Sequence, residues 1–232
     1  FLRNKITFKN VKNKDAIDLG CGIGRYTFVL KDMGFKNVLG VDFSKRNIQH
    51  ARSLSKKYKI KNVEFKCMNI MNLNFNYKFD FAFSYGSFHH TQSIDICIKK
   101  MKKILKKKSE GILYVSHKGG MRWAVVQLCR NILKNVKHKK IYDYFNKSLE
   151  TPKKKYLILD HILVPINKLS TPQSVEKIFK NNNIKRFKRL KRGSNTDDIE
   201  NIYQYKNKIS TKNLFYIFGY GENRYYFWIN EK

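Results

Sequence analysis

Short apolar runs alternate with amphipathic stretches along the first half of the chain. An apolar run from Asp15 into Gly20 and four more at 37–42, 63–67, 79–84 and 111–116 predict five strands. Apolar residues at three- and four-residue spacing predict helices over 44–58 and 94–106. Strands that alternate with helices in this way predict an α/β chain, with a Rossmann-like, doubly wound sheet that is mostly parallel.

The second half adds an insertion and a closing unit. Thr171 to Lys180 has the pattern of a helix, with Pro172 in its first turn. Two aromatic runs, 214–218 and 225–229, flank a stretch with two glycines and predict an antiparallel C-terminal hairpin. We expect one domain over 1–232 in three parts: a first half at 1–116, a helical insertion after the fifth strand at about 117–170, and the closing helix and hairpin at 171–232.

The insertion contains a predicted amphipathic helix over 122–136. Its apolar stripe is Val125, Cys129, Ile132 and Val136, and the basic residues Arg130 and Lys134 lie opposite. A basic amphipathic helix of this kind can lie on an anionic membrane, which would be a peripheral contact. Such stripes more often pack on their own domain, and we expect packing here.

Three closely spaced glycines follow the first predicted strand. Gly20, Gly22 and Gly24 lack a Cβ, so the backbone can turn sharply and approach a ligand where the next helix begins. Asp18 stands at the end of the strand, facing this turn. Glycines after a buried strand also serve helix–strand packing alone, so the turn needs a second element before it indicates a ligand site.

The second element is a carboxylate at the end of the second strand. Asp42 follows Gly22 by 20 residues, and an acid so placed in a doubly wound sheet can accept both hydroxyls of a ribose. The alternative is that Asp42 only caps the helix that starts near Ser44. Taken with the glycines, the spacing favours a nucleoside site.

With these motifs the sequence resembles the class I S-adenosylmethionine-dependent methyltransferases, and among them the type 11 methyltransferase domains. Four blocks in the order and spacing of that family carry the resemblance: Asp18 to Gly24, Gly40 to Ser44, Cys67 to Phe75, and Phe79 to Thr91. They cover roughly the first half of the chain. The resemblance implies S-adenosylmethionine as cofactor, methyl transfer by in-line displacement, and an insertion at 117–170 that caps the substrate and sets specificity.

The resemblance also implies roles for single residues. The cofactor would lie against Asp18, Gly20, Cys21, Gly22, Gly24, Asp42, Phe43, Asn69, Ile70, Ser84 and Tyr85. Asp18 and the glycine turn would hold its methionine part and Asp42 its ribose. Asn69 stands where the family usually has Asp, and its carbonyl would accept from the adenine amino group while Ile70 packs on the ring.

His89 and His90 would face the substrate in this family arrangement. If the acceptor is a hydroxyl, they are the candidates for a general base, since imidazole titrates near neutrality. Either histidine can instead bond only to the backbone or cap the following turn. In-line displacement needs no metal, and we expect none.

The chain departs from the family at two places. Residues 107–111 stand where a Pro-Gly-Gly turn is usual, which alters a turn and not the chemistry. The sequence begins at Phe1 with a short segment before its first strand, whereas the family usually carries one or two helices there. We therefore expect an N-terminal truncation.

Cysteine usage and hydropathy bound the class of protein further. Cys21, Cys67, Cys97 and Cys129 form no C-x-x-C pair, which argues against a zinc site or a disulfide framework and predicts buried free thiols. No apolar run approaches the ~20 residues that span a bilayer, and no signal peptide opens the chain. We expect a cytoplasmic protein.

The formal net charge is +32, from 49 Lys and Arg against 17 Asp and Glu. Such a chain should associate with RNA and other polyanions at low salt, without sequence specificity. The basic runs are scattered, and no RNA-binding signature is present. Abundant Asn, Ile, Phe and Tyr accompany the lysines, and all of these residues have AT-rich codons. We therefore expect a small-molecule acceptor, such as a sugar, a lipid-linked molecule or another metabolite. The alternatives are an RNA methyltransferase and a methyltransferase-like binding protein without turnover.

Overall fold

The computed structural model describes residues 10–148 and 161–190 without a gap, together with residues 4, 6, 8, 159, 213, 217, 219 and 222–229. These residues form one seven-stranded sheet in the order β3-β2-β1-β4-β5-β7-β6. The strands are β1 (Asp15–Leu19), β2 (Asn37–Asp42), β3 (Val63–Cys67), β4 (Phe79–Tyr85), β5 (Leu105–Val115), β6 (Arg186–Arg189) and β7 (Asn223–Trp228). β1 to β5 pair in parallel, and β7 runs antiparallel between β5 and β6.

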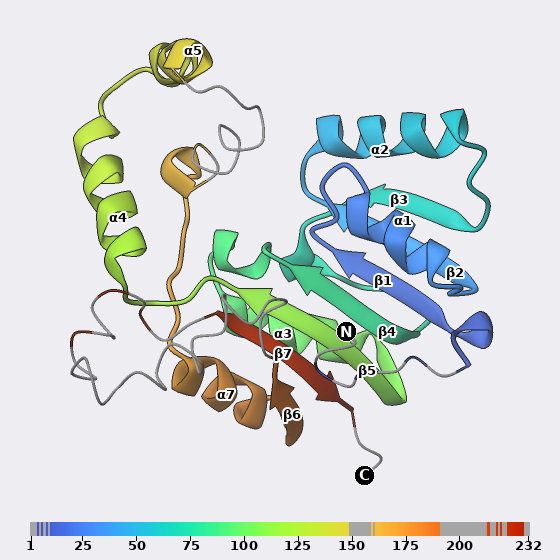
Figure 1. The fold of residues 1–232 in the computed structure, drawn as a ribbon. Coiled ribbons are helices and arrows are strands. Elements are labelled where there is room, and N and C mark those ends of the chain that lie inside the picture. Colours follow the sequence, from blue (N-terminus) through green and yellow to red (C-terminus); the bar gives the residue numbers. More distant parts are fainter. Residues whose placement is uncertain are drawn as a thin grey trace.

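Helices cover both faces of this sheet (Figure 1). They are α1 (Arg25–Asp32), α2 (Lys45–Lys57), α3 (Ile94–Lys103), α4 (Met121–Leu133), α5 (His138–Ser148) and α7 (Pro172–Asn181), with short 3-10 turns η2 (Val11–Asn13), η3 (Ile70–Asn72) and η4 (Phe88–His90). The predicted doubly wound, mostly parallel α/β fold is therefore confirmed. α4 and α5 form an arm that stands away from the sheet beyond the carboxyl end of β5 (Figure 1).

Alternation along the strands fills two apolar layers. Ile17 and Leu19 of β1 face a core that includes Ile98 of α3 and Phe179 of α7, whereas Ala16 faces a second core on the α1 side. A strand buried on both faces explains the nearly continuous apolar runs in the sequence. The described residues contain no helix long and apolar enough to cross a membrane.

Local capping signals are placed as the sequence predicts. Ser44 caps α2, with its Oγ accepting from the Asn47 amide at 3.2 Å. Thr171 caps α7 in the same way, and Pro172 occupies the first helical position. These side chains satisfy amides that have no partner within the helix, so the helix starts follow from sequence alone.

β5 begins earlier than the predicted 111–116, and α3 ends at Lys103 instead of Lys106. Phe79 pairs with Leu105 and Phe81 with Glu110, so the residues between form a bulge. Lys108 has φ 61° in this bulge, which is the turn expected at 107–111. A helical pattern continues through the lysines, but pairing with β4 takes residue 105 into the sheet.

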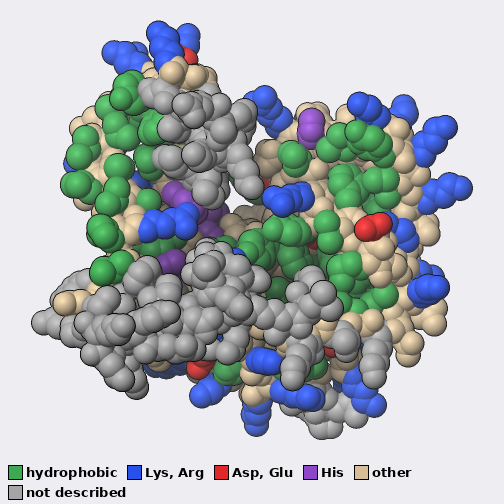
Figure 2. All heavy atoms as spheres, viewed as in Figure 1, with side chains coloured by type: hydrophobic (Ala, Val, Ile, Leu, Met, Phe, Trp, Pro, Cys, Tyr) green, Lys and Arg blue, Asp and Glu red, His purple; other side chains and the backbone are tan. Residues whose placement is uncertain are grey.

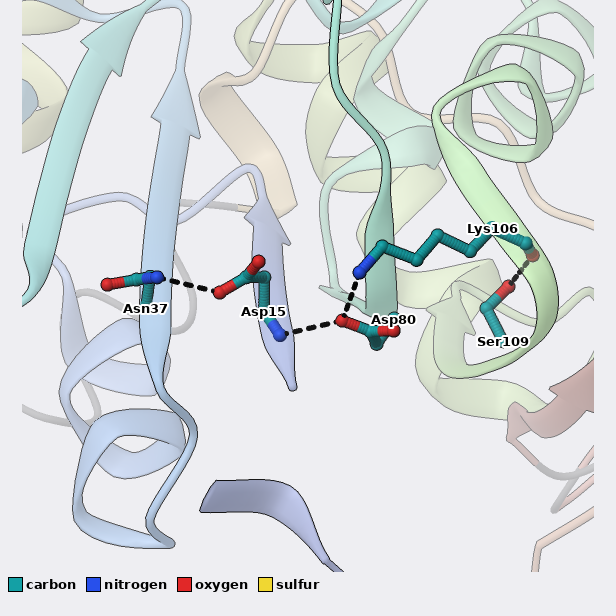
Figure 3. A network of polar contacts seen from close by, with 5 residues as sticks. All are labelled: Asp15, Asn37, Asp80, Lys106 and Ser109. Atoms are coloured by element: carbon teal, nitrogen blue, oxygen red, sulfur yellow. Dashed lines mark hydrogen bonds and ion pairs between the residues drawn. The ribbon is translucent and has the colours of Figure 1, made fainter. Parts of the chain in front are cut away.

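A polar network fixes the strand ends beside this bulge (Figure 3). Asp80 of β4 accepts from the Asp15 amide at 2.9 Å and from Lys106 Nζ at 2.8 Å. Asn37 of β2 donates to Asp15 at 2.8 Å, and Ser109 donates to the Lys106 carbonyl at 2.6 Å. The network joins β2, β1 and β4 at the amino ends of these strands and connects them to the bulge of β5.

The C-terminal antiparallel pair is confirmed, but its members differ from the predicted runs. β7 contains most of 225–229, and both of its edges are paired, one with β5 and the other with β6 at 186–189. The run 214–218 lies outside the described residues except for Ile217. β6 escaped sequence analysis because Arg186–Arg189 is basic, and only pairing with β7 makes it a strand.

The four cysteines are free thiols, as predicted, but not all are buried. Cys21 and Cys97 are buried, Cys129 is half-buried and Cys67 is exposed at the end of β3. Cys97 and Cys21 belong to apolar cores of the domain.

Gly40 of β2 is a position where added volume should destabilise the sheet. A Cβ there would lie 2.7 Å from the Phe65 ring and 2.9 Å from Thr27 Oγ1. We expect Gly40→Ala to lower the free energy of unfolding by ~1–3 kcal/mol, the usual cost of overpacking. Denaturant titration of Gly40→Ala alone and with Phe65→Leu measures the coupling. Equal losses with and without the Phe65 ring would contradict this account.

Candidate functional site

The glycine turn lies at the carboxyl ends of β1 and β2. The amides of Gly20 and Cys21 donate to the Val41 carbonyl at 2.7 and 3.0 Å, which folds the turn back over β2. Gly22 has φ 55°, and a Cβ built on it meets nothing within 4 Å. Open space therefore adjoins the turn at Gly22, in the direction that a side chain would take. Gly20 and Gly24 instead face protein, because a Cβ on them would meet Ser87 at 2.1 Å and Phe65 at 2.8 Å.

Asp42 connects the turn to the start of α2. Its Oδ2 accepts from the Gly22 amide at 2.9 Å, and its Oδ1 accepts from the Ser44 amide at 2.9 Å and from Asn47 Nδ2 at 3.4 Å. Asp42 thus supports the helix start, as the capping alternative expects, and also holds the glycine turn, while its role toward a ribose stays a prediction. A carboxylate oxygen has two lone pairs, so Oδ2 retains capacity for a ligand hydroxyl.

Asp18 lies beneath the turn and is only 1% exposed. Its carboxylate accepts from Thr27 Oγ1 of α1 at 2.7 Å. Burial raises the pKa of Asp18 to about 7; the Thr27 bond opposes this shift, and the neighbouring Asp42 adds to it. Asp18 therefore acts from below, through packing and charge, and makes no open surface at the turn.

Cys21 is a buried member of the turn. Its thiol donates to the Gly22 carbonyl at 3.6 Å. Burial raises the pKa of Cys21, with the carboxylates of Asp18 and Asp42 acting in the same direction. The thiol stays protonated, and the Cys21 backbone is bonded within the protein, its amide to the Val41 carbonyl and its carbonyl to the Gly24 amide.

The region expected to hold an adenine ring lies after β2 and β3. Phe43 is 77% exposed there, whereas Ile70 is buried. Asn69 Oδ1 accepts from the Met71 amide at 2.9 Å and so caps η3. This bond occupies one lone pair of the amide oxygen and leaves the Nδ2 donors for another partner.

Ser84 and Ser87 fix the loop after β4. Both hydroxyls donate to the Leu19 carbonyl, at 3.0 and 2.8 Å, and they lie 2.8 Å from each other. Ser84 is fully buried, so it supports the site from beneath and does not line it. These bonds hold the β4 loop against the end of β1, next to Gly20.

Tyr85 begins an aromatic group that follows the ends of β4 and β5. Its ring lies 4.6 Å from Tyr114 and 5.2 Å from Tyr26, between centroids. The Arg224 guanidinium stands 5.4 Å from the Tyr85 ring and 5.5 Å from the Tyr114 ring. Tyr85 is half-buried and is thus placed at the edge predicted for it.

The adjacent histidines His89 and His90 differ in burial and in hydrogen-bond partner. His89 is 2% exposed, and its Nδ1 accepts from the Ser116 amide at 3.2 Å. Burial lowers the pKa of His89 to about 3, and His90 and His161 add to the effect. His89 therefore stays neutral and joins β4 to β5. The assumption that it titrates near neutrality is wrong.

His90 is half-buried and has the geometry of a proton acceptor. Its Nδ1 lies 2.9 Å from the Ile166 carbonyl. A carbonyl can only accept, so we assign the proton to Nδ1, which leaves the Nε2 lone pair. This orientation is common for histidines that accept a proton.

Residues 161–170, here called the strap, return to the sheet from the insertion. The Lys168 amide donates to the His89 carbonyl at 2.9 Å, and the Ser170 amide donates to the Ser116 carbonyl at 3.1 Å. Arg130 of α4 donates to the carbonyls of His161 and Ile162 at 3.0 Å and to that of Pro165 at 3.3 Å. The arm, the strap and the ends of β4 and β5 are thus connected.

Sequence analysis missed a group of side chains under the arm. Trp123 Nε1 donates to His117 Nε2 at 3.1 Å, and Arg122 donates to His161 Nε2 at 2.9 Å. The Trp123 ring meets His161 edge to face, with centroids 5.0 Å apart. Figure 2 shows histidine side chains gathered where the surface is hollowed between the arm and the rest of the molecule. No local motif links these positions, because the strap brings them together.

A family model described as a methyltransferase domain matches residues 10–183. The chain belongs to this methyltransferase domain family. The predicted class I S-adenosylmethionine-dependent methyltransferase domain is confirmed, and S-adenosylmethionine is its cofactor.

The names of two relatives of this methyltransferase domain indicate different substrates. The ubiquinone biosynthesis O-methyltransferase of Pelagibacter ubique is 34% identical over 108 residues, 47% of this chain and 43% of that protein. The tRNA U34 carboxymethyltransferase of Campylobacter fetus is 29% identical over 104 residues, 44% of this chain and 36% of that protein. The matches thus cover less than half the length of these curated relatives.

A solved structure resembles nearly the whole methyltransferase domain. PKMT2 from Rickettsia typhi aligns with a TM-score of 0.66 and 18% identity, over 97% of this chain and 52% of that one. Its complex with AdoHcy aligns with a TM-score of 0.64 and 19% identity, over 96% of this chain and 51% of that one. At this identity the likeness is one of fold.

The residues at the glycine turn of the methyltransferase domain fit S-adenosylmethionine. Gly22 leaves space above the turn, and Asp42 is held with acceptor capacity beside it. Among the described residues no group of three or more His, Cys, Asp or Glu is arranged to hold a metal ion. The acceptor capacity of Asp42 and the open space at Gly22 suit the ribose of a nucleoside.

The buried carboxyl of Asp18 should make stability depend on pH. Its pKa in the folded state, about 7, exceeds the ordinary 3.8, so its contribution is fully present below pH 3.8 and is lost as pH rises through about 7. We expect Asp18→Asn to gain stability relative to the wild type between about pH 5 and pH 8. Urea titrations at both pH values measure the difference.

Asp143→Asn, which changes an exposed carboxyl of α5, controls for loss of a carboxylate elsewhere. Its difference from the wild type should stay constant over the same range. A constant difference for Asp18→Asn as well would show that Asp18 has no raised pKa.

Proposed function

We propose that this domain transfers a methyl group from S-adenosylmethionine to a small-molecule acceptor, such as a sugar, a lipid-linked molecule or another metabolite. The observation that carries the proposal is that the candidate residues lie together at the carboxyl ends of the parallel strands. Asp42 and Tyr85 are the last residues of β2 and β4, and Gly22, with its open side, and His90 come shortly after the carboxyl ends of β1 and β4. Ligands of doubly wound sheets bind at this edge.

The cofactor residues divide the work by chemistry. Asp42 would accept the ribose hydroxyls, and the Gly20–Gly24 backbone would approach the amino acid part. Asp18 would support this part of the site from beneath, through its bond with Thr27. Asn69 and Ile70 would hold the adenine, with Phe43 beside them. When bound, the cofactor supplies an activated methyl group, and the protein mainly holds acceptor and methyl in line, an arrangement that contributes ~7–11 kcal/mol in well-oriented reactions.

His90 is the base in this proposal if the acceptor is a hydroxyl. Its Nδ1–H bond to the Ile166 carbonyl directs Nε2 away from the strap. His89 has a supporting role, because its Nδ1 already accepts from the Ser116 amide. The strap and the α4–α5 arm belong to 117–170, the segment that we propose sets specificity.

The distribution of lysines supports a small acceptor over RNA. A surface cavity of about 1150 Å³ is lined by Lys78, Lys99, Lys100, Lys102, Lys103, Lys107 and Lys185, with Leu105 and Ile229 among the other lining residues. Leu105 begins β5, so this basic cavity lies at the opposite end of that strand from the proposed site. An RNA substrate would need its positive surface to lead to the methyl group.

Cofactor binding should depend on Gly22 and Asp42. Gly22→Val puts a branched side chain into the space above the turn, and Asp42→Ala removes the acceptor that also holds the Gly22 amide. We expect each to weaken binding of S-adenosylmethionine and its demethylated product by ~1–3 kcal/mol. Calorimetry measures the affinities.

Gly34→Ala is the matched control, since Gly34 also has positive φ but lies after α1, with Val11 as the neighbour of an added Cβ. Its affinity should equal that of the wild type. Wild-type affinity in both site variants would overturn the assignment of the cofactor residues.

The acceptor class can be tested directly. The protein is incubated with labelled cofactor and either a metabolite extract or total RNA at physiological salt. We expect label in a low-molecular-weight product and none in a defined RNA, because RNA bound only through scattered lysines dissociates as salt rises. Specific label in one RNA species would establish the RNA alternative. Cofactor binding with no transfer to either pool would favour a binding protein without turnover.

The extract that accepts label also tests His90. For a hydroxyl acceptor, His90→Gln should lower the transfer rate by about 10²–10⁴, the usual contribution of a general base. Its affinity for the cofactor should stay at the wild-type value. An unchanged rate would leave His90 as a structural residue.

A further inference from the structure

The apolar stripe of α4 faces solvent instead of its own domain. Met121, Val125, Leu128 and Ile132 are 57%, 52%, 59% and 65% exposed. Their spacing of four, three and four residues places them on one side of the helix. Trp123 and Arg130 project from other sides and contact His117 and the strap. Of the stripe expected to pack on the domain, Val125 and Ile132 are exposed, whereas Cys129 and Val136 are half-buried. The packed face of α4 instead carries Trp123 and Arg130.

Basic residues surround this stripe. Residues 118–148 contain eight Lys or Arg and a single acidic residue, Asp143. Lys134, Lys137, Lys139, Lys140 and Lys147 are all exposed, as are the rings of Tyr142 and Tyr144 on α5. Figure 2 shows hydrophobic side chains following α4 along the arm, with basic side chains gathered at the α5 end.

Four large exposed apolar side chains in one row indicate an interaction surface. The charge of the surrounding residues distinguishes between two possible partners, a second copy of the chain and a lipid bilayer. A second copy of the chain would carry the same +32 charge and bring its own lysines against these, which opposes association. An anionic bilayer offers apolar depth for the stripe and negative headgroups for the lysines.

We propose that the outer face of α4, with the lysines of α5, docks on an anionic phospholipid bilayer. The stripe enters the boundary between headgroups and acyl chains, and lysines of the arm extend to the phosphate groups. This docking does not depend on methyl transfer. It holds the arm at the lipid surface while the sheet edge with Gly22 and His90 stays on the protein side.

Vesicle sedimentation tests the proposal. The full chain is mixed with vesicles of phosphatidylcholine alone, or of equal parts phosphatidylcholine and phosphatidylglycerol. We expect binding to the mixed vesicles only. The pair Leu128→Gln and Ile132→Gln should reduce the partition coefficient about tenfold, and the triple change of Lys137, Lys139 and Lys140 to Gln should reduce it by a similar factor.

Ile96→Gln is the matched control. Ile96 is 43% exposed on α3 and is surrounded by lysines of the basic cavity, so a general effect of apolar or basic surface would change its binding too. We expect binding within twofold of the wild type for this control, by the usual weakness of isolated surface changes. Folding of each variant is checked by calorimetry, which should give the wild-type affinity for S-adenosylmethionine. If the wild-type chain binds no cofactor, circular dichroism checks folding instead.

Several outcomes would overturn the docking surface. One is binding to mixed vesicles that the α4 pair leaves unchanged, since this would be surface electrostatics alone. Another is no binding to either vesicle. A third is self-association in sedimentation velocity that the α4 pair abolishes, which would assign the stripe to a second copy.

Discussion

The hydrogen bond from the Gly22 amide to the Asp42 carboxylate joins the ends of β1 and β2, and the geometry of the candidate site depends on it. It forms because Leu19 is in register with Val41 in the parallel pair, so both strands end at the same level. The Val41 carbonyl then receives the Gly20 and Cys21 amides. The turn is thus shaped by β2 as much as by its own glycines. An acceptor at this position holds the turn whether or not a ligand is present.

Hydrogen bonds between segments far apart in sequence hold the rest of the site at the carboxyl ends of the strands. Ser84 and Ser87 hold the Leu19 carbonyl, which fixes the loop after β4 against β1. The backbone of the strap bonds to His89 and Ser116. His90 is then oriented by the Ile166 carbonyl of the strap. The direction of its Nε2 therefore depends on how the insertion returns to the sheet.

Local signals explain which parts of the fold could be predicted from sequence. Strands buried on both faces and helices capped by Ser44 or Thr171 are specified by residues near one another in the chain. The glycine turn and Asp42 are found because their spacing reflects one strand–helix–strand unit. β6 has no such signal, since its basic residues become a strand only against β7. The difference between His89 and His90 was equally hidden, because Ser116 and Ile166 decide it.

Charge gives the site a character opposite to that of the chain. Within a protein of net charge +32, Asp18 and Asp42 are brought together beneath and beside the glycine turn, close enough for Asp42 to contribute to the raised pKa of Asp18. Lysines line a cavity at the other end of β5 and the surface of the arm. In the proposed complex, a cationic cofactor would meet the Asp42 carboxylate at the turn although the molecule as a whole repels it. Methyl transfer would convert the sulfonium to a neutral thioether, which the Asp42 carboxylate would attract less, so this carboxylate would favour the reactant over the product.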